Sequence, residues 1–261
     1  MGFFDSHSHL NDEKFDEDRD KIIKEIYEAG TTNFVTAGYS DESSKKAVDI
    51  ANNYEFIYAT VGISPNDIPQ KEEELWKQIL EIKDFAKSNK KVLAIGEIGL
   101  DYYWNVENKE LQKKAFIEQI KLANELDLPI VIHTRDAVMD TLQILKENEV
   151  KNKGIFHCCP QNRELIKEGL KLGFYISFAG PITFKNSKNA DEIINLVPNN
   201  RILIETDSPY LAPEPVRGTR NTPANVKFVA KKIADVKGLT LEEVEKITVE
   251  NTKEILRIGE L

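Results

Sequence analysis

The chain has 261 residues, of which 41% are hydrophobic, so it is long enough for the core of one α/β barrel domain or of two small domains. Its formal net charge of -9 disfavours a broad basic surface that grips nucleic acid by its phosphates, so any anionic substrate has to be attracted locally. No apolar run approaches the roughly 18 residues that cross a bilayer and no signal-peptide pattern occurs, so we expect a cytoplasmic protein without membrane contacts.

Short apolar and β-branched runs recur at intervals of roughly 30 residues and predict strands. They lie around Phe3, Phe34, Ile57, Val92, Ile130, Ile155, Tyr175 and Ile202. Some of these runs, such as residues 202–204, are apolar at every position, which is typical of parallel strands covered on both faces. We therefore expect eight parallel strands.

Charged segments with helical spacing of apolar residues separate the strand candidates. One contains Ile22, Ile23 and Ile26, and another contains Leu111 and Ala115. Eight strands that alternate with helices predict an α/β fold of the (β/α)8 TIM-barrel class. No repeat, low-complexity segment or Pro- and Gly-rich linker divides the chain, so we expect one domain over residues 1–261.

Two segments near the C-terminus have distinct patterns. Residues 208–223 contain four of the ten prolines and predict a long loop. From Leu239 onward, Thr240 and Glu243 form a capping-box pattern ahead of apolar residues at helical spacing. This pattern predicts a C-terminal helix packed on the barrel.

All four histidines of the chain follow predicted strands. His7 and His9 are two residues apart, so in an extended segment they project to the same side. His133 and His157 end the fifth and sixth strand candidates. A single such histidine is more often a packed core residue, but four at the barrel rim where catalytic groups gather indicate a metal site.

Two acidic residues also leave apolar strands, Glu97 after the fourth and Asp207 after the eighth. Burying a carboxylate is costly unless it is paired or binds a metal, and a structural ion pair with Lys or Arg is the alternative. Six ligands exceed one open site, so we expect two divalent ions (Mg, Mn or Zn), with Glu97 as the bridge. Asp207 is the candidate for orienting the attacking water and accepting its proton.

Further residues are expected around this site. Candidates for phosphate contacts, each of which could instead be a solvated surface charge, are Lys185, Arg217, Arg220 and Arg135. Tyr102, Tyr103 and Trp104 could stack on bases or simply pack a loop on the barrel mouth. Asp5 and Glu205 are candidates for orienting the ligand histidines, and Asp5 could also cap its strand.

Seven stretches of the chain occur in the order and with the content typical of one family. They are FDSHSHL, VGISP, GEIGLDYY, VIHTRDA, FHC, ISFAGPITF and ETDSPYLAPEPVRGTRNTP. From Asp5 to about Leu256 the sequence resembles the TatD-type metal-dependent deoxyribonucleases among the amidohydrolase-like barrels. The resemblance implies a TIM barrel with two divalent ions on the six residues named above. It also implies hydrolysis of DNA phosphodiester bonds, often from the 3′ end of a single strand.

Two positions depart from that family's pattern. Ser64 stands where the family often has His, and Cys159-Pro160-Gln161 stands where it usually has Phe-Ser-Gly. Both positions would flank the site without supplying a ligand, so they bear on substrate choice and rate. Cys158 and Cys159 are adjacent and poorly placed for a mutual disulfide, which fits a reducing compartment.

Three hypotheses follow from these residues. The first is a 3′ to 5′ deoxyribonuclease acting as a monomer on single-stranded DNA. The second is an amide or ester hydrolase on the same metals, such as an aminoacyl-tRNA deacylase or a small-molecule amidohydrolase, because fold does not fix substrate. No lysine at a strand end suggests a carbamylated ligand, which favours phosphate chemistry. The third is a metal- or nucleic-acid-binding module without catalysis.

Overall fold

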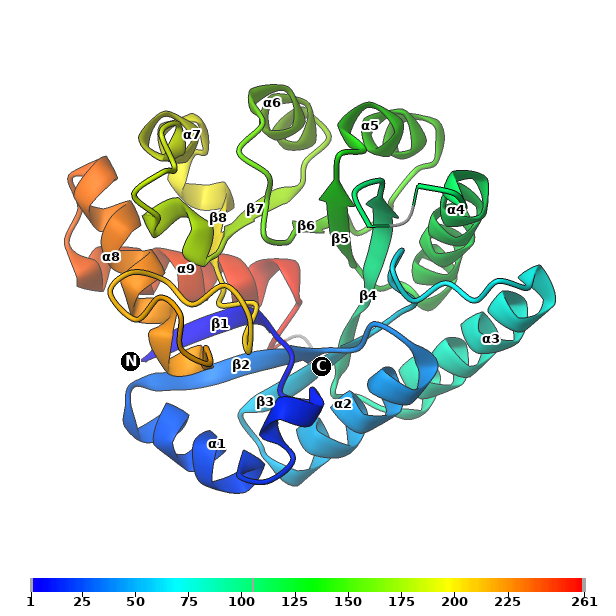
Figure 1. The fold of residues 1–261 in the computed structure, drawn as a ribbon, viewed down its shortest axis with the longest axis horizontal. Coiled ribbons are helices and arrows are strands. Elements are labelled where there is room, and N and C mark those ends of the chain that lie inside the picture. Colours follow the sequence, from blue (N-terminus) through cyan, green and yellow to red (C-terminus); the bar gives the residue numbers. More distant parts are fainter. Residues whose placement is uncertain (1, 105, 260–261) are drawn as a thin grey trace.

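A barrel of parallel strands forms the centre of the computed structural model, which describes residues 2–104 and 106–259. Within these residues eight strands pair in parallel in the order of the sequence (Figure 1). They are β1 (Phe3–Ser8), β2 (Thr31–Ala37), β3 (Ile57–Val61), β4 (Val92–Asp101), β5 (Ile130–Arg135), β6 (Gly154–Phe156), β7 (Tyr175–Phe178) and β8 (Ile202–Ile204). The predicted strands and the barrel class are confirmed.

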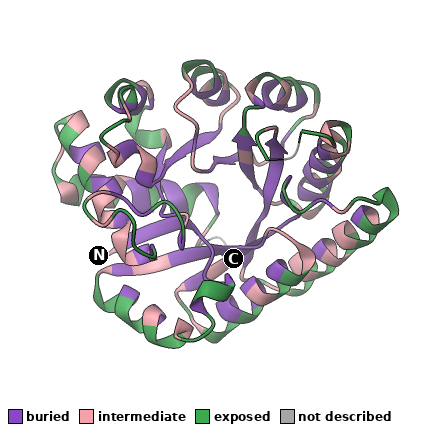
Figure 2. Cartoon of the chain, in the orientation of Figure 1, coloured by how far each residue is buried: buried purple, intermediate pink, exposed green. Residues whose placement is uncertain are grey.

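Helices surround this sheet and follow the strands in turn (Figure 1). They are α1 (Arg19–Glu28), α2 (Asp41–Asn53), α3 (Glu72–Ser88), α4 (Lys109–Leu126), α5 (Val138–Glu147), α6 (Arg163–Lys171), α7 (Ala190–Leu196) and α8 (Val226–Lys237), with short 3-10 turns η1 (Glu13–Phe15), η2 (Gly180–Thr183), η3 (Asn199–Arg201) and η4 (Pro223–Asn225). Their buried faces turn toward the strands, as Figure 2 shows. Among the described residues, no helix combines the length and apolar character needed to cross a membrane.

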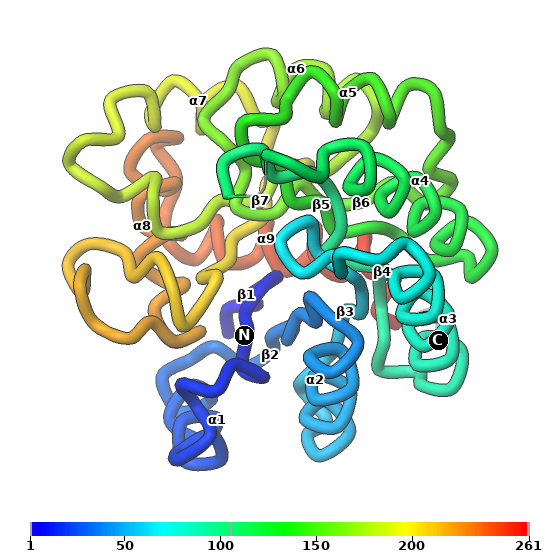
Figure 3. The backbone as a smooth tube through the Cα atoms, turned by 45° about the vertical axis from the view of Figure 1, so that its right-hand side comes forward, coloured from blue at the N-terminus to red at the C-terminus, as the bar shows by residue number. Residues whose placement is uncertain are grey.

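The ninth helix, α9 (Leu241–Ile255), covers the end of the barrel at which the strands begin. Its capping box is formed as predicted, because Thr240 Oγ1 accepts from the Glu243 backbone N–H at 3.1 Å while the Glu243 carboxylate accepts from Thr240 N–H at 2.7 Å. Val249 and Leu256 join a buried cluster with the inward residues of the strands. In Figure 3 this helix, in red, passes behind the strands. The predicted packing of a C-terminal helix on the barrel is confirmed.

The barrel closes between β1 and β8 through side chains and loop backbone. Ser6 Oγ donates to the Ile204 carbonyl at 3.0 Å, and the Asp5 carboxylate accepts the Thr206 backbone N–H at 3.0 Å. Just beyond, the backbone N–H of Asp207 donates to the carbonyl of His7 at 3.0 Å. The seam therefore joins the two chain segments that carry His7 and Asp207.

Candidate metal centre

The six side chains predicted as ligands converge at the mouth of the barrel where the strands end. They come from β1, β4 and β5 and from the turns after β1, β6 and β8. The side chains of all six are at most 20% exposed: His7, His9, Glu97, His133, His157 and Asp207. The fold thus gathers residues up to 200 positions apart in one buried cluster.

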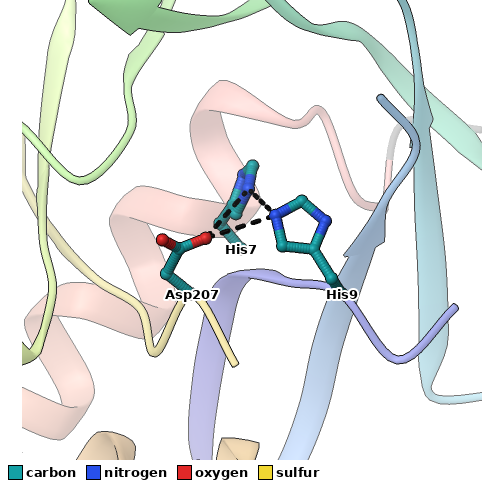
Figure 4. Close-up of side chains that lie close together, drawn as sticks. All are labelled: His7, His9 and Asp207. Atoms are coloured by element: carbon teal, nitrogen blue, oxygen red, sulfur yellow. Dashed lines mark hydrogen bonds and ion pairs between the residues drawn. The ribbon is translucent and has the colours of Figure 1, made fainter. Parts of the chain in front are cut away.

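One group of donor atoms comes from the two N-terminal histidines and Asp207, as Figure 4 shows. The Nε2 atoms of His7 and His9 are 3.2 Å apart. Oδ1 of Asp207 lies 3.7 Å from the first and 3.2 Å from the second. Two neutral nitrogens and one carboxylate oxygen at such spacing could hold a divalent cation.

A second group comes from His133 and His157. Nδ1 of His133 and Nε2 of His157 are 3.2 Å apart, and they lie 3.0 and 3.4 Å from Oε1 of Glu97. The other oxygen of Glu97, Oε2, is 3.5 Å from His7 Nε2 and 3.6 Å from His9 Nε2. One carboxylate therefore faces both groups with a different oxygen each, as a bridging ligand would.

Local irregularities of the strands lie beside two of these candidate ligands. The register between β1 and β2 shifts between Asp5 and Ser8, and that between β4 and β5 shifts between Ile95 and Ile98. Such shifts re-aim side chains at the ends of barrel strands. His7 and Glu97 each lie inside one of the shifted segments.

Further polar groups fix the histidine rings from behind. Asp101 Oδ2 lies 2.8 Å from Nε2 of His133, and Glu205 Oε1 lies 3.3 Å from Nδ1 of His157. The carbonyl of Ala37 lies 3.0 Å from Nδ1 of His9. Each partner can accept a hydrogen bond from a ring N–H, which leaves the other ring nitrogen free to bind a cation.

Of the two residues predicted to orient the histidines, Glu205 lies beside His157, whereas the Asp5 carboxylate accepts the backbone N–H of His7, at 3.2 Å, and that of Thr206. Asp5 therefore holds the backbone of β1 and of the segment after β8, and not an imidazole ring. Asp101 was not among the predicted residues. It is the last residue of β4, whereas Glu97, which was expected at the end of that strand, lies inside it. An acidic residue that follows an apolar run is the signal that could have identified Asp101.

Charges within the cluster shift the pKa values of most of its side chains in the direction opposite to the shift caused by burial. Burial alone would raise the pKa of Glu97, but the charge of His157 and hydrogen bonds from three histidines lower it well below its usual value. The pKa of Asp207 is likewise lowered, against burial, by the hydrogen bond and charge of His9. Conversely, Asp207 and Glu97 outweigh burial and raise the pKa of His9 to about 9. The pKa of His7, in contrast, is lowered, first by burial and then by the charge of His157. Ionised carboxylates and a protonated His9 therefore stabilise one another in this cluster, and a metal cation could replace the proton of His9.

The cluster opens into a cleft of about 710 Å³ lined by His9, Tyr39, Ser64, Asn66, Asp67, Glu97, Trp104, Arg135, Asp207, Tyr210 and Leu211. Of the predicted phosphate-binding residues, Arg135 lines this cleft. Arg220 pairs with Asp18, with Nη1 2.9 Å from Oδ1. The Arg217 guanidinium lies 4.2 Å from the Phe184 ring centroid, and Lys185 is exposed in the turn after η2. The structure therefore places one of the four predicted phosphate-binding side chains, that of Arg135, at the site.

The positions that depart from the family pattern flank the centre. The Ser64 hydroxyl donates to Asp67 Oδ2 at 2.6 Å on the wall of the cleft. Cys159 is buried in the hydrophobic core, while Pro160 and Gln161 line a second groove that Tyr102 also lines. Cys158 and Cys159 are both free thiols.

Comparisons with known proteins agree with this architecture. The family described as "TatD related DNase" matches residues 4–257. A metal-dependent hydrolase of Bacillus subtilis, YabD, is 44% identical over 259 residues, which cover 98% of this chain and 99% of YabD. The crystal structure of the TatD homolog YJJV from Escherichia coli superposes with a TM-score of 0.92 at 24% identity, covering 98% of both chains. A TatD family hydrolase from Entamoeba histolytica superposes with a TM-score of 0.87, also at 24% identity, covering 98% of both chains.

Proposed function

Because the chain belongs to the TatD-related DNase family of metal-dependent hydrolases, we propose that it is a deoxyribonuclease that uses two divalent cations to remove nucleotides from the 3′ end of single-stranded DNA. The observation that carries the proposal is the position of Glu97, whose two oxygens face separate donor groups. Two cations that share one bridging carboxylate suit displacement at phosphorus, since both the attacking and the leaving oxygen need stabilisation.

The six residues divide between the two cations. His7, His9 and Asp207 would hold one, His133 and His157 the other, and Glu97 both. When bound, the cations supply positive charge for the phosphoryl oxygens and lower the pKa of water in the cleft. Asp101 and Glu205 keep the His133 and His157 rings oriented, because each accepts from the ring nitrogen that faces away from the cluster.

Asp207 has the position of a general base. Its side chain is 15% exposed and lines the cleft, so it reaches both the histidines and the space for substrate. Its lowered pKa keeps the carboxylate ionised at neutral pH. In this role it orients a water in the cleft and accepts a proton as the phosphodiester is attacked.

The test is cleavage of 5′-labelled single-stranded DNA by the metal-stripped protein after addition of Mg, Mn or Zn. A ladder that shortens from the 3′ end, and that Glu97→Gln abolishes without changing the circular dichroism spectrum, is the expected result. Intact DNA with every metal, in protein shown by metal analysis to bind two ions, would refute the nuclease activity.

A small-molecule ester or amide hydrolase is the second candidate. The cleft favours it in one respect, because Arg135 is the one Lys or Arg among its described lining residues and a long polyanion would find few basic partners there. A panel of esters, lactones and cyclic amides, including an aminoacyl ester, would distinguish the two. Turnover of any of these faster than of DNA would favour this candidate.

A further inference from the structure

A large aromatic side chain stands exposed at the edge of the cleft. Trp104 follows β4, is 68% exposed and lines the cleft. Its neighbour Tyr103 is 52% exposed, and the two rings stand nearly perpendicular, at 89°, with centroids 4.8 Å apart. Apolar rings this open beside a site are typical of ligand contacts.

Hydrogen bonds to Asp101 hold the backbone that carries these rings. Asp101 Oδ1 accepts the backbone N–H of Tyr103 at 2.9 Å and that of Trp104 at 3.0 Å. The other oxygen of the same carboxylate contacts His133. The Asp101 side chain therefore links the backbone of Trp104 to His133.

Arg135 completes this wall of the cleft. It lies two residues after His133 and ends β5. Its guanidinium is 3.8 Å from the Tyr103 ring centroid and 5.5 Å from that of Trp104. An arginine held against aromatic rings presents its N–H groups in a fixed plane, which suits a phosphate.

We propose that Trp104 and Arg135 form a subsite for one unpaired nucleotide next to the scissile bond, with Trp104 stacked on the base and Arg135 bound to a phosphate oxygen. The proposal rests on the nuclease function and adds the part of the substrate that is recognised. Stacking on an aromatic side chain tolerates every base, because each base has a π face. A base in a duplex already stacks on its neighbours, so the subsite selects an unpaired end.

The activity test compares two single-stranded oligonucleotides that differ only in having a base or an abasic tetrahydrofuran unit at the 3′-terminal or penultimate position. We expect the wild type to prefer the base by about tenfold in kcat/KM, and Trp104→Ala to lose this preference while Trp104→Phe retains part of it. Arg135→Gln should slow both oligonucleotides equally, since both carry the phosphates. Equal effects of Trp104→Ala on the two oligonucleotides would overturn the proposal.

A second readout does not depend on cleavage. The chain has two tryptophans, and Trp76 lies in α3, half-buried against the core. Titration with oligothymidylate should quench the fluorescence of the wild type and not that of Trp104→Phe. Quenching without cleavage would refute the nuclease function and support the subsite. Cleavage without quenching would support the nuclease function and refute the subsite.

Tyr27→Ala is the matched control for both measurements. Tyr27 is an aromatic side chain, 48% exposed on α1, beside Gly2 in a groove at the opposite end of the barrel. Its replacement should alter neither the preference for the base nor the quenching.

Discussion

Asp101 connects two functions through its two carboxylate oxygens, since one contacts His133 and the other holds the backbone of Tyr103 and Trp104. Asp101→Asn keeps the size of the side chain but removes the charge that favours the proton on Nε2 of His133. We expect metal affinity to fall about 10- to 100-fold, as is typical when a histidine ligand loses its partner. Isothermal titration calorimetry measures this, with the exposed Asp235 on α8, changed to Asn, as the control. An unchanged affinity would contradict the role of Asp101.

The raised pKa of His9 predicts a pH dependence of metal binding. With a pKa of about 9 in the metal-free protein against an ordinary 6.5, this imidazole is protonated at neutral pH and has to lose a proton before it can bind a cation. Metal affinity should therefore rise with pH between about 6.5 and 9, and the metal-free protein should lose stability over the same window. Calorimetry in buffers of different ionisation enthalpy should show proton release at pH 7. Binding without proton release would contradict this prediction.

The sequence identified site residues of rare types more reliably than those of common types. Four histidines, all at strand ends, are hard to explain otherwise, so the ligand candidates could be named from the sequence. Basic side chains are common on any surface, and the pairing of Arg220 with Asp18 depends on two segments that only the fold brings together. Asp101 was missed because its contact with His133 depends on the pairing of β4 with β5, which the sequence does not show.

At the level of elements, α9 fills one end of the barrel with apolar side chains. Leu256, the C-cap residue directly after α9, is 2% exposed and packs in the same cluster as Phe4 and Leu203. We expect Leu256→Ala to lower the free energy of unfolding by about 2–4 kcal/mol, because it removes buried contacts and leaves a cavity. Urea denaturation measures this, and Leu80→Ala, at a position 61% exposed on α3, should cost less than about 0.5 kcal/mol. Equal effects of the two substitutions would show that α9 contributes little.

The elements themselves were well predicted, because strand and helix periods differ and alternate along the chain. The C-terminal helix was expected to pack on the barrel, but the sequence did not indicate which end it would cover. The register shifts beside His7 and Glu97 were also beyond reach, since they depend on pairing with neighbouring strands and not on the local pattern.

At the level of the whole molecule, a chain of net charge -9 is proposed to bind a polyanion. Because Arg135 is the one Lys or Arg among the described residues lining the cleft, few phosphates can be neutralised at once. For single strands, the logarithm of affinity falls with the logarithm of salt concentration by about 0.7 for each neutralised phosphate. We therefore expect kcat/KM on DNA to follow a slope shallower than about -2 in KCl titrations. A slope steeper than about -4 would point to an extended basic track elsewhere on the surface.

The seam between β1 and β8 also bears on the order of events during synthesis. His7 is synthesised 200 residues before Asp207, yet the backbone N–H of Asp207 donates to the carbonyl of His7. Contacts of such sequence separation form late, because a long loop has to close before they can contribute. The group of side chains that contains His7 and His9 is therefore complete only after β8 has joined the barrel. A nascent chain is in this way kept from assembling its hydrolytic centre until the barrel around it has closed.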